Sequence, residues 1–446
     1  MKTWVREMKA SLCEVKVSLR GVKAWRHGAR VVLLSALLFA PQRLPAQTPS
    51  SPPVPAKTAG ALAAEPLRVS AAGADAAEPA LAADRAGRVF VVWVEHDARG
   101  GADVSVARYE PVRGRLSAPV RVNPRAGAAT AWRGDPPTLA FAPDGALHVG
   151  WTARVGKTGH ATDLYVSTSR DGGRTFAPPV RVNDDPKPVD RGLHSLAVAP
   201  DGRIHVAWLD DRNAPAPEVK TEGHHEEPNR ELFAAYSTDG GRTFTANRRV
   251  AADVCPCCKT ALAVAPGGRV YVGWRQVLPG EFRHIAVAAS ADGGRTFAPY
   301  VVVSDDRWQL DGCPVSGPAL AVTEDGAALN VLWYAAGTLG EPGLYRSETR
   351  DGGRTYAPRS VVSAGRARGT PLLLASASGA LFAVWESTAG GAARPVALPL
   401  DGAQSTARSL STNGGQLPAA VLQGARLFVA YVADAGGRRG VWLAAG

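Results

Sequence analysis

Alternating apolar positions recur along this 446-residue chain in a hairpin of constant form. The second strand of each hairpin places two aliphatic side chains and an aromatic one on the same face, as in Val89, Val91 and Trp93. In four copies the opposite face carries a small residue directly before the aromatic one: Gly150, Ala207, Gly273 and Ala430. Strands that are apolar on both faces and joined by Gly and Pro turns predict a packed all-β array. Seven copies occur, and they end at Trp93, Trp151, Trp208, Trp274, Trp333, Trp385 and Tyr431.

A third strand is predicted after each of these aromatic residues, and a fourth strand, such as 179–182, completes the unit. Four strands per unit correspond to one blade of a β-propeller, so the pattern predicts seven blades, with six blades and an extra hairpin as the alternative. The chain ends after a third strand at 441–444. Residues 67–70 resemble the fourth strand at 180–183, and we expect them to complete the last blade and cover its exposed edge.

Four near-identical octets, spaced 53 to 68 residues apart, read SRDGGRTF, STDGGRTF, SADGGRTF and TRDGGRTY. Each predicts a tight turn, because the Asp can accept hydrogen bonds from backbone N–H groups and the Gly pair supplies positive φ angles. The Thr and the aromatic residue are expected to return the chain to a strand. The structural positions of the octets are Asp171, Gly173, Thr175, Asp239, Gly241, Thr243, Asp292, Gly294, Thr296, Asp351, Gly353 and Thr355.

These octets resemble the Asp-box, or BNR repeat, of the sialidase and neuraminidase family. The pattern S-x-D-x-G-x-T-aromatic is complete in three copies and lacks only the leading Ser in the fourth. The resemblance implies a β-propeller whose site lies on the face opposite the Asp-boxes. Sialidases have six blades, so the predicted seven depart from that family.

For a working enzyme the resemblance implies three Arg that clamp a carboxylate, a Tyr nucleophile activated by a Glu, and an Asp acid/base. The Arg-Ile-Pro motif of the family is missing from this sequence, so no catalytic residue can be carried over. The missing motif favours an exported propeller that binds a glycan or protein ligand over the alternative, an exo-α-sialidase or other glycoside hydrolase. The positional candidates on the expected face are Arg133, Asp135, Arg191, Arg275, Tyr334 and Glu386.

The N-terminal 46 residues predict a signal peptide. A basic segment precedes an apolar run at 31–40, and small residues near 46 offer a cleavage site. The run is shorter than the roughly 20 residues that a transmembrane helix needs. We therefore expect a secreted or periplasmic protein without a stable membrane span, with an uncleaved anchor as the alternative. A Pro/Ser/Ala-rich linker at 47–64 would precede a single, monomeric domain at 65–446.

The net charge of the chain is +11, but the first 46 residues hold nine Lys or Arg against two Glu, which leaves about +4 for the rest. The remainder shows no basic cluster interleaved with aromatic residues. A high pI alone would suggest nucleic acid as a partner. Because most of the excess charge lies in the predicted signal peptide, we expect no nucleic-acid partner.

Four of the five cysteines follow the signal peptide: Cys255, Cys257, Cys258 and Cys313. The repeat register places all four before the first strands of two adjacent blades, so their sulfur atoms are expected to lie close together. In an exported protein this predicts a disulfide between Cys313 and one member of the triplet. The alternative is a soft-metal site for copper(I) or zinc, with help from the His and Glu residues at 224–227. No other cofactor is indicated.

Overall fold

The computed structural model describes residues 65–445, apart from 99, 131–133, 157–159, 215–227, 366, 390, 401–405 and 412–413. The predicted signal peptide, the whole predicted linker, Arg133 and the 224–227 segment lie outside the described residues. Every regular element in the described part is a β-strand, which confirms the all-β prediction. The same residues include no helix long and apolar enough to cross a lipid bilayer.

Antiparallel hydrogen bonding organises most strands into sets of four, which we number along the chain. Set 1 comprises β2 (Asp75–Ala83), β3 (Val89–His96), β4 (Ala102–Glu110) and β6 (Val120–Arg121). Set 2 comprises β8 (Thr138–Phe141), β9 (Leu147–Arg154), β10 (Thr162–Ser169) and β11 (Val180–Arg181). Set 3 comprises β12 (Arg191–Val198), β13 (Ile204–Asp210), β14 (Arg230–Ser237) and β15 (Arg248–Val254). Set 4 comprises β16 (Ala261–Val264), β17 (Val270–Leu278), β18 (Phe282–Ser290) and β19 (Val301–Val302).

The C-terminal part of the chain repeats the same arrangement. Set 5 comprises β20 (Ala319–Val322), β21 (Leu329–Ala335), β22 (Gly343–Thr349) and β23 (Ser360–Ala364). Set 6 comprises β24 (Ala367–Ala375), β25 (Leu381–Ser387), β26 (Arg394–Pro399) and β27 (Arg408–Ser409). Short pairings join some sets into larger sheets: β7 (Ala129–Thr130) pairs with both β4 and β9, and β15 pairs with β17. A further short strand, β5 (Arg115–Leu116), pairs with β4.

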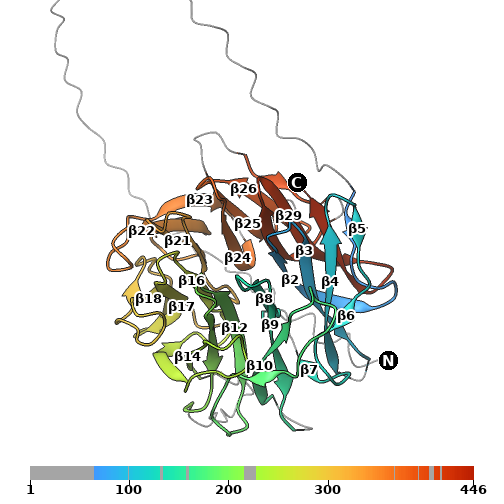
Figure 1. Cartoon of the computed structure of the whole chain (residues 1–446). Coiled ribbons are helices and arrows are strands. Elements are labelled where there is room, and N and C mark those ends of the chain that lie inside the picture. The colour runs from blue at the N-terminus through green and yellow to red at the C-terminus, as the bar shows by residue number, and fades with distance from the viewer. Residues whose placement is uncertain are drawn as a thin grey trace, which may run out of the picture. The chain divides into compact units, whose positions relative to one another are not determined.

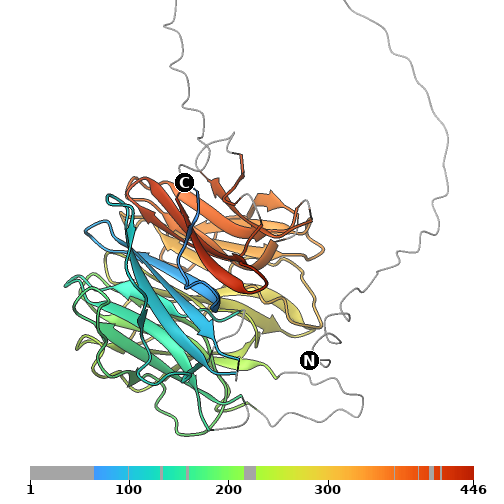
Figure 2. The ribbon, with the colours of Figure 1, turned by 90° about the vertical axis from the view of Figure 1, so that its right-hand side faces the viewer.

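Set 7 takes its fourth strand from the other end of the chain. It consists of β28 (Gln416–Gln423), β29 (Arg426–Asp434), β30 (Arg439–Ala445) and β1 (Leu67–Arg68). Leu67 lies opposite Leu443, and Arg68 lies opposite Trp442. Figure 2 shows the blue N-terminal segment against the red C-terminal strands. The predicted pairing of 67–70 with the last strand is confirmed.

The first strands of the sets contact one another in succession around a common centre. β2 contacts β8, β8 contacts β12, and the succession continues through β16, β20 and β24 to β28. β28 in turn contacts β2, so the last set lies beside the first. Figure 1 shows β2, β8, β12, β16 and β24 near the same central region. The apolar core continues across this junction, because Trp93 of set 1 packs in one cluster with Phe428 and Val441 of set 7.

The Asp-boxes are turns whose hydrogen bonds match the sequence prediction. Asp171 Oδ1 accepts from the backbone N–H groups of Arg174 and Thr175 at 2.9 and 3.0 Å, and Asp171 Oδ2 accepts from Thr175 Oγ1 at 2.6 Å. Gly172 and Gly173 have φ angles of 74° and 79°. One detail of the prediction is wrong: Thr175 and the following aromatic residue lie outside the strands, because Asp171 holds Thr175 within the turn and β11 begins only at Val180.

Candidate functional site

A cavity of about 330 Å³ lies among the first strands, and its lining includes residues from all seven sets. Most of the lining side chains are Pro, Leu, Ala and Thr. Small-molecule sites commonly have volumes of roughly 300–1,000 Å³ and combine an apolar lining with a few polar groups. The charged residues of the lining are Glu78, Lys259, Arg368 and Glu386.

The cavity residues at which the first strands begin and the Asp-boxes lie at opposite ends of the strands. In set 2 the cavity-lining Thr138 begins β8 and lies opposite Gly150 of β9. Leu147, at the other end of β9, lies opposite both Phe141 and Ser169, and Ser169 opens the Asp-box. The segments that lead into the first strands therefore line the cavity at the end away from the Asp-boxes.

Four first strands contain a β-bulge close to this end. The register shifts after Ala77 in β2, after Gly192 in β12, after Arg368 in β24 and after Gln416 in β28. The shift in β24 contains Gly369, and each of the other three contains a non-glycine residue with a left-handed backbone: Glu78, Leu193 and Leu417 have φ angles of 51°, 53° and 51°. Such a conformation costs roughly 1–3 kcal/mol per residue and is concentrated at functional sites. Bulges also redirect side chains next to active sites, and Glu78 and Leu417 both line the cavity.

The two carboxylates of the lining are buried and hydrogen-bonded. Glu78 is 2% exposed, and its Oε2 lies 2.7 Å from His96 Nε2. Glu386 is 1% exposed, and its Oε2 accepts a hydrogen bond of 2.8 Å from the backbone N–H of Leu417. This bond links set 6 to set 7 at the bulge, so Glu386 holds the left-handed backbone of Leu417 in place.

Two basic residues complete the charged lining and differ in their partners. Lys259 Nζ lies 3.2 Å from Asp135 Oδ1, and His194 Nδ1 lies 3.2 Å from the same oxygen. Burial alone would raise the pKa of Asp135, but the charges of Lys259 and His194 outweigh it and hold that pKa well below its usual value. Arg368 lies opposite Glu386 on the neighbouring strand, is exposed, and forms no hydrogen bond or ion pair with the described residues.

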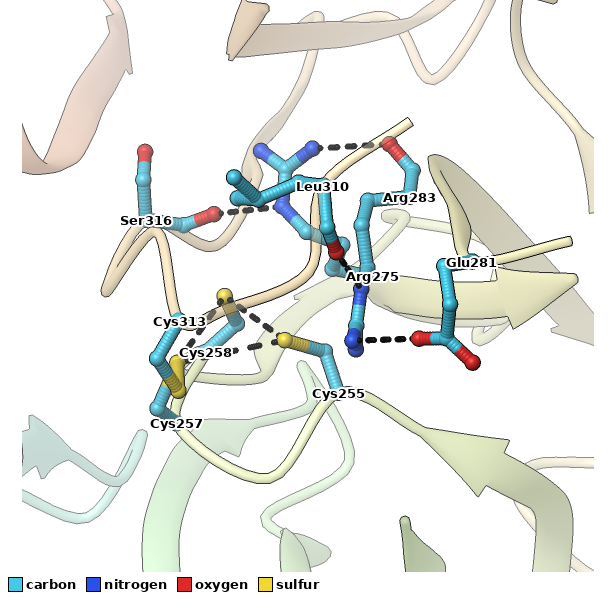
Figure 3. Close-up of a disulfide and its surroundings, with 9 residues drawn as sticks. All are labelled: Cys255, Cys257, Cys258, Arg275, Glu281, Arg283, Leu310, Cys313 and Ser316. Carbon is cyan, nitrogen blue, oxygen red and sulfur yellow. Dashed lines mark hydrogen bonds and ion pairs between the residues drawn. A yellow bond between two sulfur atoms is a disulfide. The ribbon is translucent and has the colours of Figure 1, made fainter. Parts of the chain in front are cut away.

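The four cysteines gather beside this cavity. Cys257 and Cys313 form a disulfide that joins the segment before β16 to the segment before β20. Cys255 and Cys258 are reduced and fully buried, with their sulfur atoms 3.5 Å apart (Figure 3). Cys257 Sγ lies 3.9 Å from the sulfur atoms of both. The predicted disulfide is thus present, and the spacing of Cys255 and Cys258 is C-x-x-C, which the sequence analysis overlooked.

The two reduced thiols have opposite electrostatic surroundings. The hydrogen bond that Cys255 shares with Cys258 lowers the pKa of Cys255, and the charges of Arg275 and Arg283 act in the same direction against the effect of burial. Burial raises the pKa of Cys258. Arg275 is itself fixed by the carbonyl oxygens of Ser316 and Arg283, to which it donates at 2.9 and 3.1 Å (Figure 3).

A comparison with protein families matches residues 87–332 to the BNR repeat-like domain. The chain belongs to this BNR family. The match spans more than half of the chain and includes three of the four octets, so the relationship inferred from the Asp-boxes is confirmed. A search of curated proteins finds no significant match to the sequence.

Solved structures resemble this BNR protein at low sequence identity. An ulvan lyase of polysaccharide lyase family PL25 has a TM-score of 0.54 at 12% identity, over 85% of this chain and 95% of its own. The polysaccharide lyase Uly1 has a TM-score of 0.53 at 11% identity, over 83% and 89% of the two chains. The Hadza microbial sialidase Hz136 has a TM-score of 0.46 at 15% identity, over 77% and 73%. At such identities the two lyases indicate a shared fold and nothing further.

The structure distributes the predicted site residues of the BNR protein over several environments. Glu386 lines the cavity, and Asp135 pairs with the lining residue Lys259. Arg191 is buried within set 3, where its guanidinium lies 3.1 Å from Asp210 and 3.4 Å from Asp163. The carboxylates of Asp210 and Asp163 neutralise Arg191. Both are distant from it in sequence, so these ion pairs could not be predicted from the sequence.

The two remaining described residues of the prediction, Arg275 and Tyr334, contact each other and the ring of Trp308. Arg275 donates to the backbone carbonyl of Tyr334 at 2.9 Å, and its guanidinium lies 4.7 Å from the centre of the Trp308 ring. Tyr334 packs edge-on against the same ring. Sequence reasoning did not single out Glu78 and Lys259. Their signal was the repeat register, because both stand just before the apolar part of a first strand.

Proposed function

We propose that this BNR protein is an exported, seven-bladed β-propeller that binds an anionic glycan in its central cavity. Support for the propeller comes from the succession of contacts between the first strands, which returns from β28 to β2. The pairing of β1 with β30 supports closure of the ring, because it covers the edge that set 7 would otherwise expose.

The observation that carries the proposed ligand class is Arg368. Its guanidinium stands at the cavity without a partner among the described residues, whereas Lys259 is paired with Asp135. A planar guanidinium binds a carboxylate or sulfate through paired, charge-assisted hydrogen bonds. The carboxylate of Glu78 lines the same cavity, and carboxylate oxygens accept hydrogen bonds from sugar hydroxyl groups. An acidic sugar presents both kinds of group.

Two further observations agree with this proposal. One of the lyases that share the fold was solved with a bound -[GlcA(1-4)Rha3S]- oligosaccharide, whose uronate and sulfate groups are anionic. The apolar run before residue 46 and the Cys257–Cys313 disulfide favour export to an oxidising compartment, where extracellular polysaccharides occur.

The experiment is a glycan array probed with the mature chain, residues 47–446, and it should include uronate, sulfated, sialylated and neutral glycans. We expect binding to acidic glycans and none to their neutral counterparts. Solutions of the bound glycans are then assayed for released sialic acid and for new unsaturated uronate ends, which separates a binding protein from an enzyme. Equal binding of neutral and acidic glycans would contradict the proposed ligand class.

A further inference from the structure

The four cysteines extend from the surface of the protein into its interior. Cys313 is exposed, Cys257 is 6% exposed, and Cys255 and Cys258 are fully buried. The sulfur of Cys257 lies in the middle, bonded to Cys313 on one side and 3.9 Å from the two reduced sulfur atoms on the other. The disulfide is therefore in van der Waals contact with a pair of reduced thiols. One disulfide and two thiols are the groups that a thiol–disulfide exchange needs.

We propose that this cluster is a thiol–disulfide exchange site, in which the disulfide moves between Cys257–Cys313 and Cys255–Cys258. In the first step the Cys255 thiolate attacks Cys257 Sγ. A Cys255–Cys257 bond forms, the Cys257–Cys313 bond breaks, and Cys313 leaves as a thiolate that takes a proton from water. In the second step the sulfur of Cys258 attacks Cys255 Sγ, the Cys255–Cys257 bond breaks, and the proton of Cys258 passes to the departing Cys257 thiolate, whose sulfur lies 3.9 Å away. Two thiols and one disulfide are present before and after, so no external oxidant is needed.

Chain geometry identifies Cys255 as the attacking group. Cys257 and Cys258 are consecutive, and consecutive Cα atoms lie about 3.8 Å apart, below the 4.4–6.8 Å usual for a disulfide. Cys255 is separated from Cys257 by one residue and from Cys258 by two, and C-x-x-C spacing is that of common redox disulfides. The lowered pKa of Cys255 and the raised pKa of Cys258 agree with this division of roles.

The exchange would alter the wall of the cavity. Cys257 lines the cavity together with Lys259 from the same segment, and Val315 lines it two residues after Cys313. With the bond between Cys257 and Cys313 in place, the segments before β16 and β20 are joined. With Cys255 and Cys258 bonded instead, these two segments are released from one another and Cys313 presents a thiol to solvent.

Labelling of the native protein tests the exchange directly. The chain is incubated without reductant in iodoacetamide, quenched in acid, unfolded, and mapped by mass spectrometry after trypsin. Cleavage after Arg249, Lys259, Arg307 and Arg346 places Cys255, Cys257 and Cys258 in one peptide, 250–259, and Cys313 in another, 308–346. We expect progressive loss of the linked pair of peptides. In its place should appear 308–346 labelled at Cys313 and 250–259 with an internal Cys255–Cys258 disulfide.

Two variants locate the steps. In Cys255→Ser the labelling of Cys313 should fall to background, whereas in Cys258→Ser labelling should persist and stop at a Cys255–Cys257 disulfide. A wild-type chain that keeps the linked peptides intact while native would overturn the proposal, without reliance on either variant. Labelling of Cys313 that is equal in wild type and Cys255→Ser would also overturn it. So would isolation of the protein with four thiols and a stoichiometric soft metal ion, measured by elemental analysis.

Discussion

His205 of set 3 lies against Gly294, in the Asp-box of set 4. A Cβ atom on Gly294 would lie 2.9 Å from His205 Nδ1. The same relationship recurs in the other Asp-boxes, where the second glycine faces a ring from the preceding set; these pairs are Gly173 with Phe90, Gly241 with His148, and Gly353 with Tyr271. The Asp-box is therefore a contact between neighbouring sets as well as a turn, and at Gly294 the glycine is required for space as well as for backbone conformation.

Gly294→Ala should destabilise the protein for both of these reasons. Gly294 has a φ of 82°, and the added methyl group would also overlap His205. Gly268→Ala is the matched control, because Gly268 has a φ of 81° and a methyl group added there would meet no atom within 4 Å. We expect the free energy of unfolding to fall further in Gly294→Ala than in the control by roughly 1–3 kcal/mol, the usual cost of overpacking. Equal losses in urea unfolding would contradict the steric contact.

The buried His205 should make stability depend on pH. Burial lowers its pKa from 6.5 to about 4, so between these values the unfolded chain binds a proton that the folded chain does not. Stability from this group is complete above pH 6.5 and is lost as the pH falls toward 4. His205→Asn, which places the residue found at the equivalent Asn330, should flatten the fall in Tm between pH 7 and pH 4.5. A Tm of His205→Asn that falls as steeply between these pH values as that of the unaltered protein would contradict this effect of burial.

Glu386 should stabilise the bulge of set 7 through its hydrogen bond with the backbone of Leu417. Glu386→Ala would leave that half-buried N–H without its acceptor, at a cost of about 1 kcal/mol in the free energy of unfolding. Glu386→Gln keeps an oxygen at the same place and should lose less. Guanidinium unfolding of both variants measures the difference, and a Gln variant as unstable as the Ala variant would contradict this role.

Repetition in the sequence made the strands and the Asp-boxes predictable. Each aromatic residue of the hairpins is buried, and the pairing of 67–70 with the last strand followed from its likeness to 180–183. Three of the bulges were not predictable, because Glu78, Leu193 and Leu417 adopt a left-handed backbone without the Gly or Asn that usually signals one. Such a conformation is imposed by tertiary contacts, which a periodic pattern in the sequence does not predict.

The candidate site was predicted only in part, for a related reason. The repeat register brought the four cysteines together correctly, since they occupy equivalent segments of adjacent sets. The positional choice of arginines could not reveal that Arg191 is surrounded by Asp163, Asp185 and Asp210, or that Arg275 is held by backbone carbonyl groups. Whether an arginine is available to a ligand depends on partners that only the folded chain assembles.

The central claim is that the cavity binds an anionic glycan through Arg368, and a titration of two variants tests it most directly. Arg368→Ala removes the guanidinium at the cavity, and Arg354→Ala removes an equal charge from an exposed position in an Asp-box at the opposite end. Calorimetric titration with the tightest acidic glycan from the array should show affinity roughly tenfold to a hundredfold lower for Arg368→Ala, as expected for one charge-assisted hydrogen-bonded pair. Arg354→Ala should bind like the unaltered protein. Equal affinities for the two variants would contradict the account.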